Sequence, residues 1–192
     1  MNLSDRFIPV ADVTERHETL VRAPASLVFD VAVHFDMQSL PGVRAILWLR
    51  EKLLGTTPAM RPRAHGLVAE TRALGWGVLA EHPPRELVMG AATQPWKADV
   101  VFTPIAPDRF TAFAEPDLVK IVWTIETEPL GPSLTRLRTE TRAVATDAAA
   151  REKFQRYWRW ARFGIVLIRW LLLPAVKRDA ERRALSGLAV AQ

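Results

Sequence analysis

Residues 146–184 read TDAAAREKFQRYWRWARFGIVLIRWLLLPAVKRDAERRA, and this pattern predicts one long C-terminal helix. Thr146 and Asp147 place oxygen-bearing side chains at its start, and three alanines follow them. At roughly 100° per residue, one stripe of this helix is apolar and rich in aromatic side chains. The stripe holds Phe154, Tyr157, Trp158, Ala161, Ile165, Ile168 and Leu172. Such a wide stripe needs a large apolar partner, which the rest of the chain must provide.

The partner is predicted to be an antiparallel sheet, because the middle of the chain alternates between apolar and polar residues. In residues 118–128, Val119, Ile121 and Trp123 fall on one side, and residues 133–145 alternate in the same way. Five further strands are expected at 15–23, 67–74, 76–81, 86–92 and 98–103. Two short helices are expected between residues 24 and 54, and another within 107–115.

The predicted fold class is therefore α+β. We expect a curved antiparallel sheet of about seven strands wrapped around the long C-terminal helix, with two short helices after the first strand. Residues 1–14 carry few pattern signals and are expected to be an extended arm. A chain of 192 residues suits one domain, here expected over residues 15–192.

The positive charge of the chain is concentrated in the last helix. The formal net charge is +5, and from Asp147 onward ten Lys and Arg stand against four Asp and Glu. A basic helix suits nucleic acid, an anionic membrane or simply a solvated face. We predict no nucleic-acid partner and consider the membrane further below.

The expected location is the cytoplasm, with membrane association left open. The chain has no cysteine, so nothing indicates an oxidising compartment. Its start, MNLSDRF, lacks the basic and apolar regions of a signal peptide. The longest apolar run, residues 163–176, contains Arg169 and Pro174 and is shorter than the roughly 20 residues of a spanning helix.

No motif for catalysis, metal or nucleotide binding is recognisable. The histidines do not stand at ligand spacing, so we predict no metal site; they are His17, His34, His65 and His82. The chain has neither a glycine-rich phosphate loop nor a G-x-S-x-G elbow. No cofactor is predicted, and the catalytic residues, if any, are unknown.

The order of elements resembles the helix-grip fold of the START/Bet v 1-like (SRPBCC) superfamily. Three stretches carry this resemblance: RHETLVRAPASLVFDVA at 16–32, TRLRTETRAVATD at 135–147 and AREKFQRYWRWARFGIVLIR at 150–169. The chain looks like a group of bacterial SRPBCC proteins without an assigned activity. The superfamily includes lipid carriers, hormone receptors, polyketide cyclases and ring hydroxylases, so the resemblance is informative about fold and poor for function.

The resemblance implies a cavity between the sheet and the C-terminal helix that holds an apolar ligand. Strand parity and helical spacing predict its lining. The predicted lining residues are Val119, Ile121, Trp123, Leu137, Thr139, Thr141, Phe154, Tyr157, Trp158 and Ala161. The predicted function is binding or carrying a lipid-like or polycyclic molecule. The alternative is an enzyme of the polyketide cyclase/dehydratase type that uses the same cavity.

Whether the protein is an enzyme depends on the polar groups that meet in that cavity. Catalysis would need at least two titratable side chains to converge there. The sequence offers Tyr157, His82 and Glu140 for this role.

The charged residues of the last strand allow two interpretations. If they face solvent, they form a cross-strand ladder, with Glu126 near Arg136 and Lys120 near Arg142. If Glu140 and Arg142 point inward instead, they form a buried pair that could act as an acid and a base.

The outer face of the C-terminal helix is predicted to be an interaction face. Phe163, Val166, Leu167 and Trp170 lie opposite the inward stripe, where polar residues are usual. Basic residues lie at its sides and end, namely Arg162, Arg169, Lys177 and Arg178. The pattern fits peripheral contact with an anionic bilayer, a homodimer, or burial of this face beneath the N-terminal arm.

Overall fold

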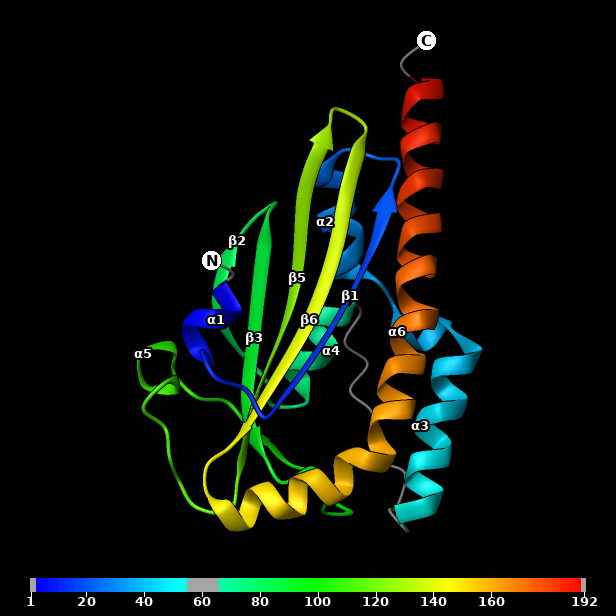
Figure 1. The fold of residues 1–192 in the computed structure, drawn as a ribbon. Coiled ribbons are helices and arrows are strands. Elements are labelled where there is room, and N and C mark those ends of the chain that lie inside the picture. The colour runs from blue at the N-terminus through cyan, green and yellow to red at the C-terminus, as the bar shows by residue number, and fades with distance from the viewer. Residues whose placement is uncertain (1–2, 55–65, 191–192) are drawn as a thin grey trace.

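The computed structural model describes residues 3–54 and 66–190, and it confirms the α+β helix-grip arrangement (Figure 1). Its elements are α1 Leu3–Phe7, β1 Val13–Val21, α2 Ala25–His34, a 3₁₀ turn Met37–Ser39, α3 Pro41–Leu54, α4 Leu67–Ala73, β2 Gly77–His82, β3 Glu86–Thr93, β4 Phe102–Thr103, α5 Pro107–Phe110, β5 Val119–Gly131, β6 Leu134–Ala145 and α6 Ala148–Val190.

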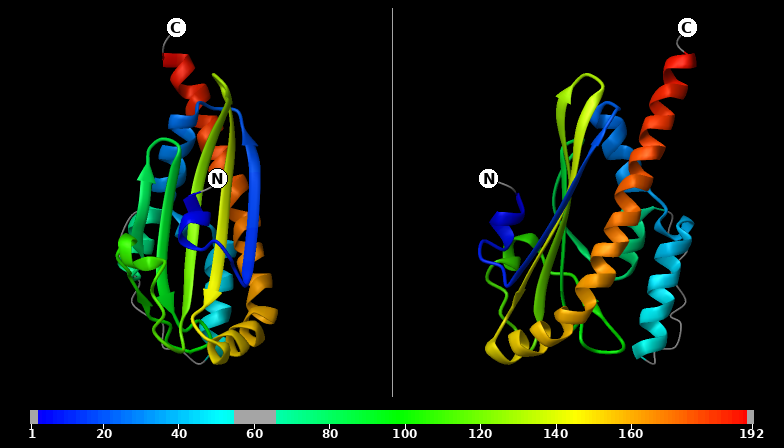
Figure 2. Two further views of the ribbon diagram at one scale, coloured as in Figure 1. Left: turned by 60° about the vertical axis from the view of Figure 1, so that its left-hand side comes forward. Right: turned by 45° about the vertical axis from the view of Figure 1, so that its right-hand side comes forward.

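The strands form one curved antiparallel sheet that does not close on itself (Figures 1 and 2). Their order is β1-β6-β5-β3-β2, and the short β4 pairs with β3. Glu15 stands opposite Thr141, Thr141 opposite Trp123, and Trp123 opposite Met89. Paired residues point to the same side of a sheet, so this row lies on one face. We call it the inner face, because α2 and α6 cover it, and the opposite one the outer face.

The long helix α6 covers the inner face at both ends. It begins beneath the sheet, bends after its first turns, and then rises beside β1 (Figures 1 and 2). The Asp147 carboxylate caps its start, since Oδ1 accepts a hydrogen bond of 2.7 Å from the backbone N–H of Ala150. Near the start Phe154 packs into a cluster with Val119, and beyond the bend Val176 joins the main core.

In the described part of the chain the sheet has six strands, in agreement with the expected number of about seven, but the strand expected at 67–74 is the helix α4. Their sequence, LVAETRA, consists mostly of good helix formers. The Thr71 hydroxyl donates a 2.6 Å hydrogen bond to the backbone carbonyl of Leu67, one turn earlier. Leu67 and Val68 then pack against the core beside α2. In a stretch this short, apolar spacing does not separate a strand from a helix.

The N-terminal segment is helical over residues 3–7 instead of extended. Phe7 is the last residue of this short helix and lies on the outer face of the sheet, where its ring meets that of Phe110 edge to face, with 5.9 Å between centroids. Burial of these rings and of Ile8 stabilises a helix too short to form alone.

The inward stripe predicted for α6 is correct near its start and at Leu172, which packs against the main core, but not in between. Phe154 is buried, but Ile165 and Ile168 are half-buried. Beyond the bend, α3 packs on this side of α6, where Ile46 Cγ2 would lie 3.6 Å from a Cβ at Gly164. The sheet is met instead by Arg169 and Leu173. The prediction used one projection for a straight helix, whereas the bend turns a different face toward the sheet.

No helix in the described part of the chain is both long and apolar enough to span a bilayer.

Candidate functional site

The inner face is packed at both ends and accessible in the middle. Val119 and Phe154 are buried at one end, and Leu137 is buried at the other. Between them lie residues that point inward but are only half-buried: Glu15, His17, Ile121, Trp123, Thr139 and Thr141. Solvent therefore reaches the centre of a surface whose ends are closed. We call Glu15, His17, Trp123, Thr139, Thr141 and the facing Arg169 of α6 the inner-face site.

Arg169 brings a buried positive charge to this site. Its side chain is 8% exposed, and Nη1 donates a hydrogen bond of 3.0 Å to the backbone carbonyl oxygen of Glu15. Nη2 donates to the hydroxyl of Thr141. Burial lowers the pKa of Arg169 to about 10, while the negative charges of Glu15 and Glu140 act in the opposite direction. No carboxylate among the described residues forms an ion pair with this guanidinium.

His17 adds a titratable group next to Arg169. Its Nε2 is buried without a hydrogen-bond partner and lies 3.9 Å from the Oε2 of Glu15. Burial lowers the pKa of His17, and the positive charge of Arg169 lowers it further, although Glu15 opposes both. The ring is therefore neutral at pH 7 and can exchange a proton or a hydrogen bond with a ligand.

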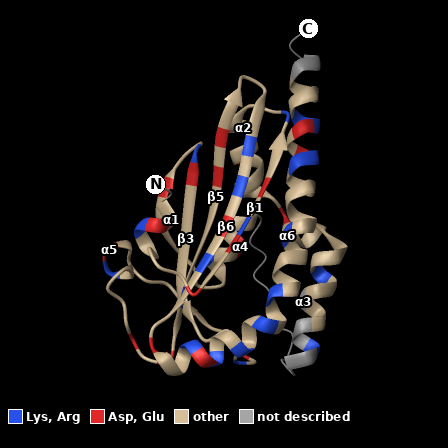
Figure 3. Cartoon of the chain, viewed as in Figure 1, with Lys and Arg blue, Asp and Glu red and all other residues tan. Residues whose placement is uncertain are grey.

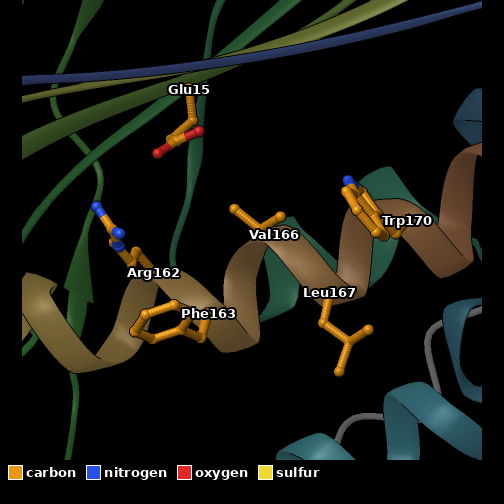
Figure 4. Close-up of a pocket in the computed structure, with 6 residues that line it drawn as sticks. All are labelled: Glu15, Arg162, Phe163, Val166, Leu167 and Trp170. Carbon is orange, nitrogen blue, oxygen red and sulfur yellow. The ribbon is translucent and has the colours of Figure 1, made fainter.

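A groove of about 400 Å³ runs between β1 and α6 beside this site. It is lined by Glu15, Arg162, Phe163, Val166, Leu167 and Trp170. Figure 4 shows Glu15 and Arg162 pointing toward each other from the strand and the helix. A second open hollow of about 550 Å³ lies nearer the start of α6, with Val13, Trp158 and Arg159 in its lining. Glu15 lines the first groove and also belongs to the inner-face site, so this groove adjoins the site.

The predicted cavity residues divide into two groups. Val119, Leu137 and Phe154 are buried in packed clusters, with Tyr157 and Trp158 half-buried against one of them. The other predicted residues are half-buried on the inner face or on α6: Ile121, Trp123, Thr139, Thr141 and Ala161. Trp158 lines the second hollow.

The sequence prediction did not include Glu15, His17 or Arg169 in the site. The alternation of residues 13–21 puts His17 on the same strand face as the buried Val21, and this is the signal in the sequence that points to His17. A straight-helix projection puts Arg169 at the side of the helix that faces away from the sheet, because it does not include the bend of α6. His82 is exposed at the end of β2, and His65 lies outside the described residues. Within residues 3–54 and 66–190, no group of His, Asp and Glu is arranged to hold a metal ion.

The charged residues of β6 lie on the outer face, so neither interpretation of Glu140 holds as it was framed. Glu140 is 2% exposed beneath α1, where its Oε2 accepts a 2.6 Å hydrogen bond from Nε of Arg16. The Ser4 hydroxyl donates to Oε1 at 3.1 Å, and Arg142 pairs with Asp5. These contacts fasten the N-terminal segment to the sheet.

The exposed part of β6 forms a ladder with a different register from the expected one (Figure 3). Arg138 pairs with Glu126 at 3.1 Å, and Arg136 pairs with Glu128 at 2.6 Å. Lys120 stands opposite Val144 instead of Arg142. The shift arises because β5 does not end at residue 128, as expected, but continues to Gly131, so that the turn into β6 comes later in the chain.

Comparison with known proteins yields only distant similarities. No protein-family model matches the chain, and no curated protein matches its sequence. A conserved protein from Geobacillus kaustophilus is similar in structure, with 11% identity over 87% of this chain and 97% of that one and a TM-score of 0.38. A protein from Chromobacterium violaceum has 14% identity, coverage of 85% and 96%, and a TM-score of 0.37.

The ZhuI aromatase/cyclase from Streptomyces sp. R1128 is also similar, with 16% identity, coverage of 89% and 94%, and a TM-score of 0.30. Similarity this distant does not carry the role of any side chain from one protein to another. The functional conclusion therefore depends on the contacts within this chain.

Proposed function

We propose that the protein is a START/Bet v 1-like (SRPBCC) binding protein that holds or carries a hydrophobic small molecule, lipid-like or polycyclic, between the inner face and α6. The observation that supports this is the half-accessible centre of an inner face whose ends are packed. Trp123 and Ile121 offer apolar surface there, and Thr139 offers a hydroxyl. An apolar surface with a few polar groups is typical of small-molecule sites.

Arg169 narrows the class of ligand. A buried guanidinium without a carboxylate partner is costly, and an anionic group on the ligand would offset that cost. The preferred ligand is therefore an apolar molecule with one carboxylate, sulfonate or similar group. Its anionic end would lie near Arg169 and its apolar part over Trp123.

Two measurements test this function. Solvent extraction of the purified protein followed by mass spectrometry should release a bound apolar molecule. Titration with 8-anilino-1-naphthalenesulfonate, an apolar anion, should show saturable binding. Thr139→Phe fills the centre of the inner face and should weaken that binding by at least about tenfold, because the phenyl ring occupies the ligand's volume.

Ser133→Phe is the matched control. Ser133 is an exposed hydroxyl residue in the turn between β5 and β6, so the same enlargement there should leave binding within about twofold of wild type. Equal binding by both variants, together with an empty extract, would refute a ligand site on the inner face.

A second candidate function is favoured by the convergence of Glu15, His17 and Arg169. A cyclase/dehydratase acting on a poly-β-ketone needs a base and a group that stabilises an enolate. A ring nitrogen of neutral His17 would take a proton from a carbon between two carbonyls. The electron pair of that C–H bond would form the enolate, whose oxygen would accept a hydrogen bond from Arg169. The enolate carbon would then attack another ketone of the same chain, and the alkoxide oxygen that forms would take the proton back from His17. The resulting hydroxyl would leave together with a hydrogen of the neighbouring carbon as water.

This alternative is tested with a poly-β-keto thioester and mass spectrometry of the products. His17→Gln should abolish cyclisation and leave binding of the apolar anion intact, since glutamine cannot act as the base. If wild type and His17→Gln both give the product pattern of the protein-free reaction, the enzymatic function is excluded and the binding function stands.

A further inference from the structure

The outer side of α6 exposes four large apolar side chains over successive turns. Trp160 is 79% exposed, Phe163 62%, Leu167 46% and Trp170 67%. Their spacing of three and four residues places them on one side of the helix. We call these four residues the aromatic face. In Figure 4, Phe163 and Leu167 point away from β1, so the sheet does not cover them. Val166, predicted to belong here, is half-buried in the groove instead.

Along α6 itself the charge around the aromatic face is positive, whereas Glu15 of β1 faces Arg162 across the groove (Figure 4). Residues 153–178 contain seven Lys and Arg and no Asp or Glu. Three of these bases are exposed and form no ion pair with any described carboxylate: Arg159, Arg162 and Arg178. The face therefore combines exposed aromatic rings with unneutralised arginines.

This charge favours a lipid surface over a second copy of the chain. In a two-fold dimer the same patch meets itself, so the arginines of one copy would approach those of the other, and residues 153–178 of α6 offer no acid to pair with them. Anionic headgroups supply the missing negative charge. Tryptophan and phenylalanine also suit the boundary between headgroups and acyl chains, because their rings are apolar but tolerate water at the edge.

We propose that the aromatic face docks the protein on an anionic lipid bilayer. The middle of α6 would lie in the plane of the interface, with Trp160, Phe163 and Trp170 among the acyl chains and Arg162 near the phosphates. This goes beyond the proposed function, because docking needs no bound ligand. The groove lined by Phe163 and Trp170 would then open toward the lipid.

The test is flotation of the ligand-free protein with vesicles of phosphatidylcholine alone and with phosphatidylglycerol added. Wild type should bind the anionic vesicles roughly 100-fold more strongly than the neutral ones, since each of three arginines contributes near the surface. Raising the salt concentration should reduce that difference. Trp170→Glu and Trp160→Glu should each weaken binding by at least about tenfold, because each inserts a charge among the acyl chains.

Leu185→Glu is the matched control, since Leu185 lies on the same helix beyond the face and is 69% exposed. It adds the same charge and should leave vesicle binding within about twofold of wild type. Circular dichroism checks that each variant is folded, and light scattering measures the oligomeric state.

Three outcomes would overturn the proposal. The first is that the wild-type protein floats with neither the anionic nor the neutral vesicles. Another is Leu185→Glu weakening binding as much as Trp170→Glu. The third is a wild-type dimer that Trp170→Glu dissociates while no vesicles bind, which would assign the face to a second copy.

Discussion

Arg169 in the middle of α6 donates a 3.0 Å hydrogen bond to the backbone carbonyl oxygen of Glu15 in β1. The contact joins segments 154 residues apart and places a positive charge in a mostly apolar interface. A carbonyl and a hydroxyl satisfy two donors of the guanidinium, but they do not neutralise it. The contact therefore leaves the guanidinium of Arg169 hydrogen-bonded but without a neutralising charge.

Replacing Arg169 with Met should separate its structural role from its binding role. We expect the free energy of unfolding to change by no more than about 1 kcal/mol or to rise, because a buried unpaired charge is replaced by an apolar side chain of similar length. Binding of 8-anilino-1-naphthalenesulfonate should fall by about tenfold or more, since a charged hydrogen bond is lost. Arg169→Lys should retain part of that binding. A large loss of stability with unchanged binding would show that Arg169 only holds the helix to the sheet.

The pKa of His17 should make stability fall in mild acid. Burial lowers this pKa in the folded protein from the value of 6.5 that applies to the unfolded chain. Below 6.5 the unfolded chain takes up a proton that the folded protein binds less readily, so the contribution of His17 to stability is present above 6.5 and is lost as the pH falls. An NMR titration of the ring should give a midpoint below 6.5.

Urea unfolding provides the complementary measurement. His17→Gln should lose less stability than wild type between about pH 7 and about pH 5. If wild type and His17→Gln show the same pH dependence, His17 does not contribute to it.

Glu140→Gln should destabilise the protein by about 2–4 kcal/mol, because it leaves Arg16 and Arg142 with less negative charge beneath α1. Glu128→Gln is the control, since Glu128 is exposed in the ladder with Arg136 and should cost less than about 1 kcal/mol. Denaturant unfolding measures both. Equal effects would mean that the network under α1 is no stronger than the surface ladder.

Gly90→Ala should destabilise the sheet by about 1–3 kcal/mol, because overpacking strains a filled core. A Cβ at Gly90 would lie 2.4 Å from Cδ1 of Leu79 and 2.8 Å from Cε2 of Phe110. Gly131→Ala is the control, since a Cβ there would meet nothing within 4 Å. A thermal melt should show a clear fall in the midpoint for the first variant only. A negligible effect of Gly90→Ala would show that Leu79 and Phe110 can move aside to make room for a methyl group at residue 90.

Most of the fold could be predicted because it rests on local periodicity. Alternation revealed β5 and β6, and helical spacing revealed α2, α3 and α6. Residues 67–73 were expected to form a strand but form α4, because a segment this short does not show whether its apolar residues follow the spacing of a strand or of a helix. The candidate site was harder to predict, since no motif marks Glu15, His17 or Arg169.

The sequence by itself determined the fold class, the start of the long helix near Thr146 and its excess of positive charge. These follow from the order of residues along the chain, because the spacing of residues in a strand or a helix determines which side chains lie on the same face. Only the tertiary structure decided that Glu140 lies beneath α1, that α3 covers one side of α6, and that Arg169 meets Glu15. The physical reason is that these contacts depend on the bend of α6 and on the register of β5 against β6. Both the bend and the register are determined by packing between segments that are far apart in the chain, and a local sequence pattern contains no information about such packing.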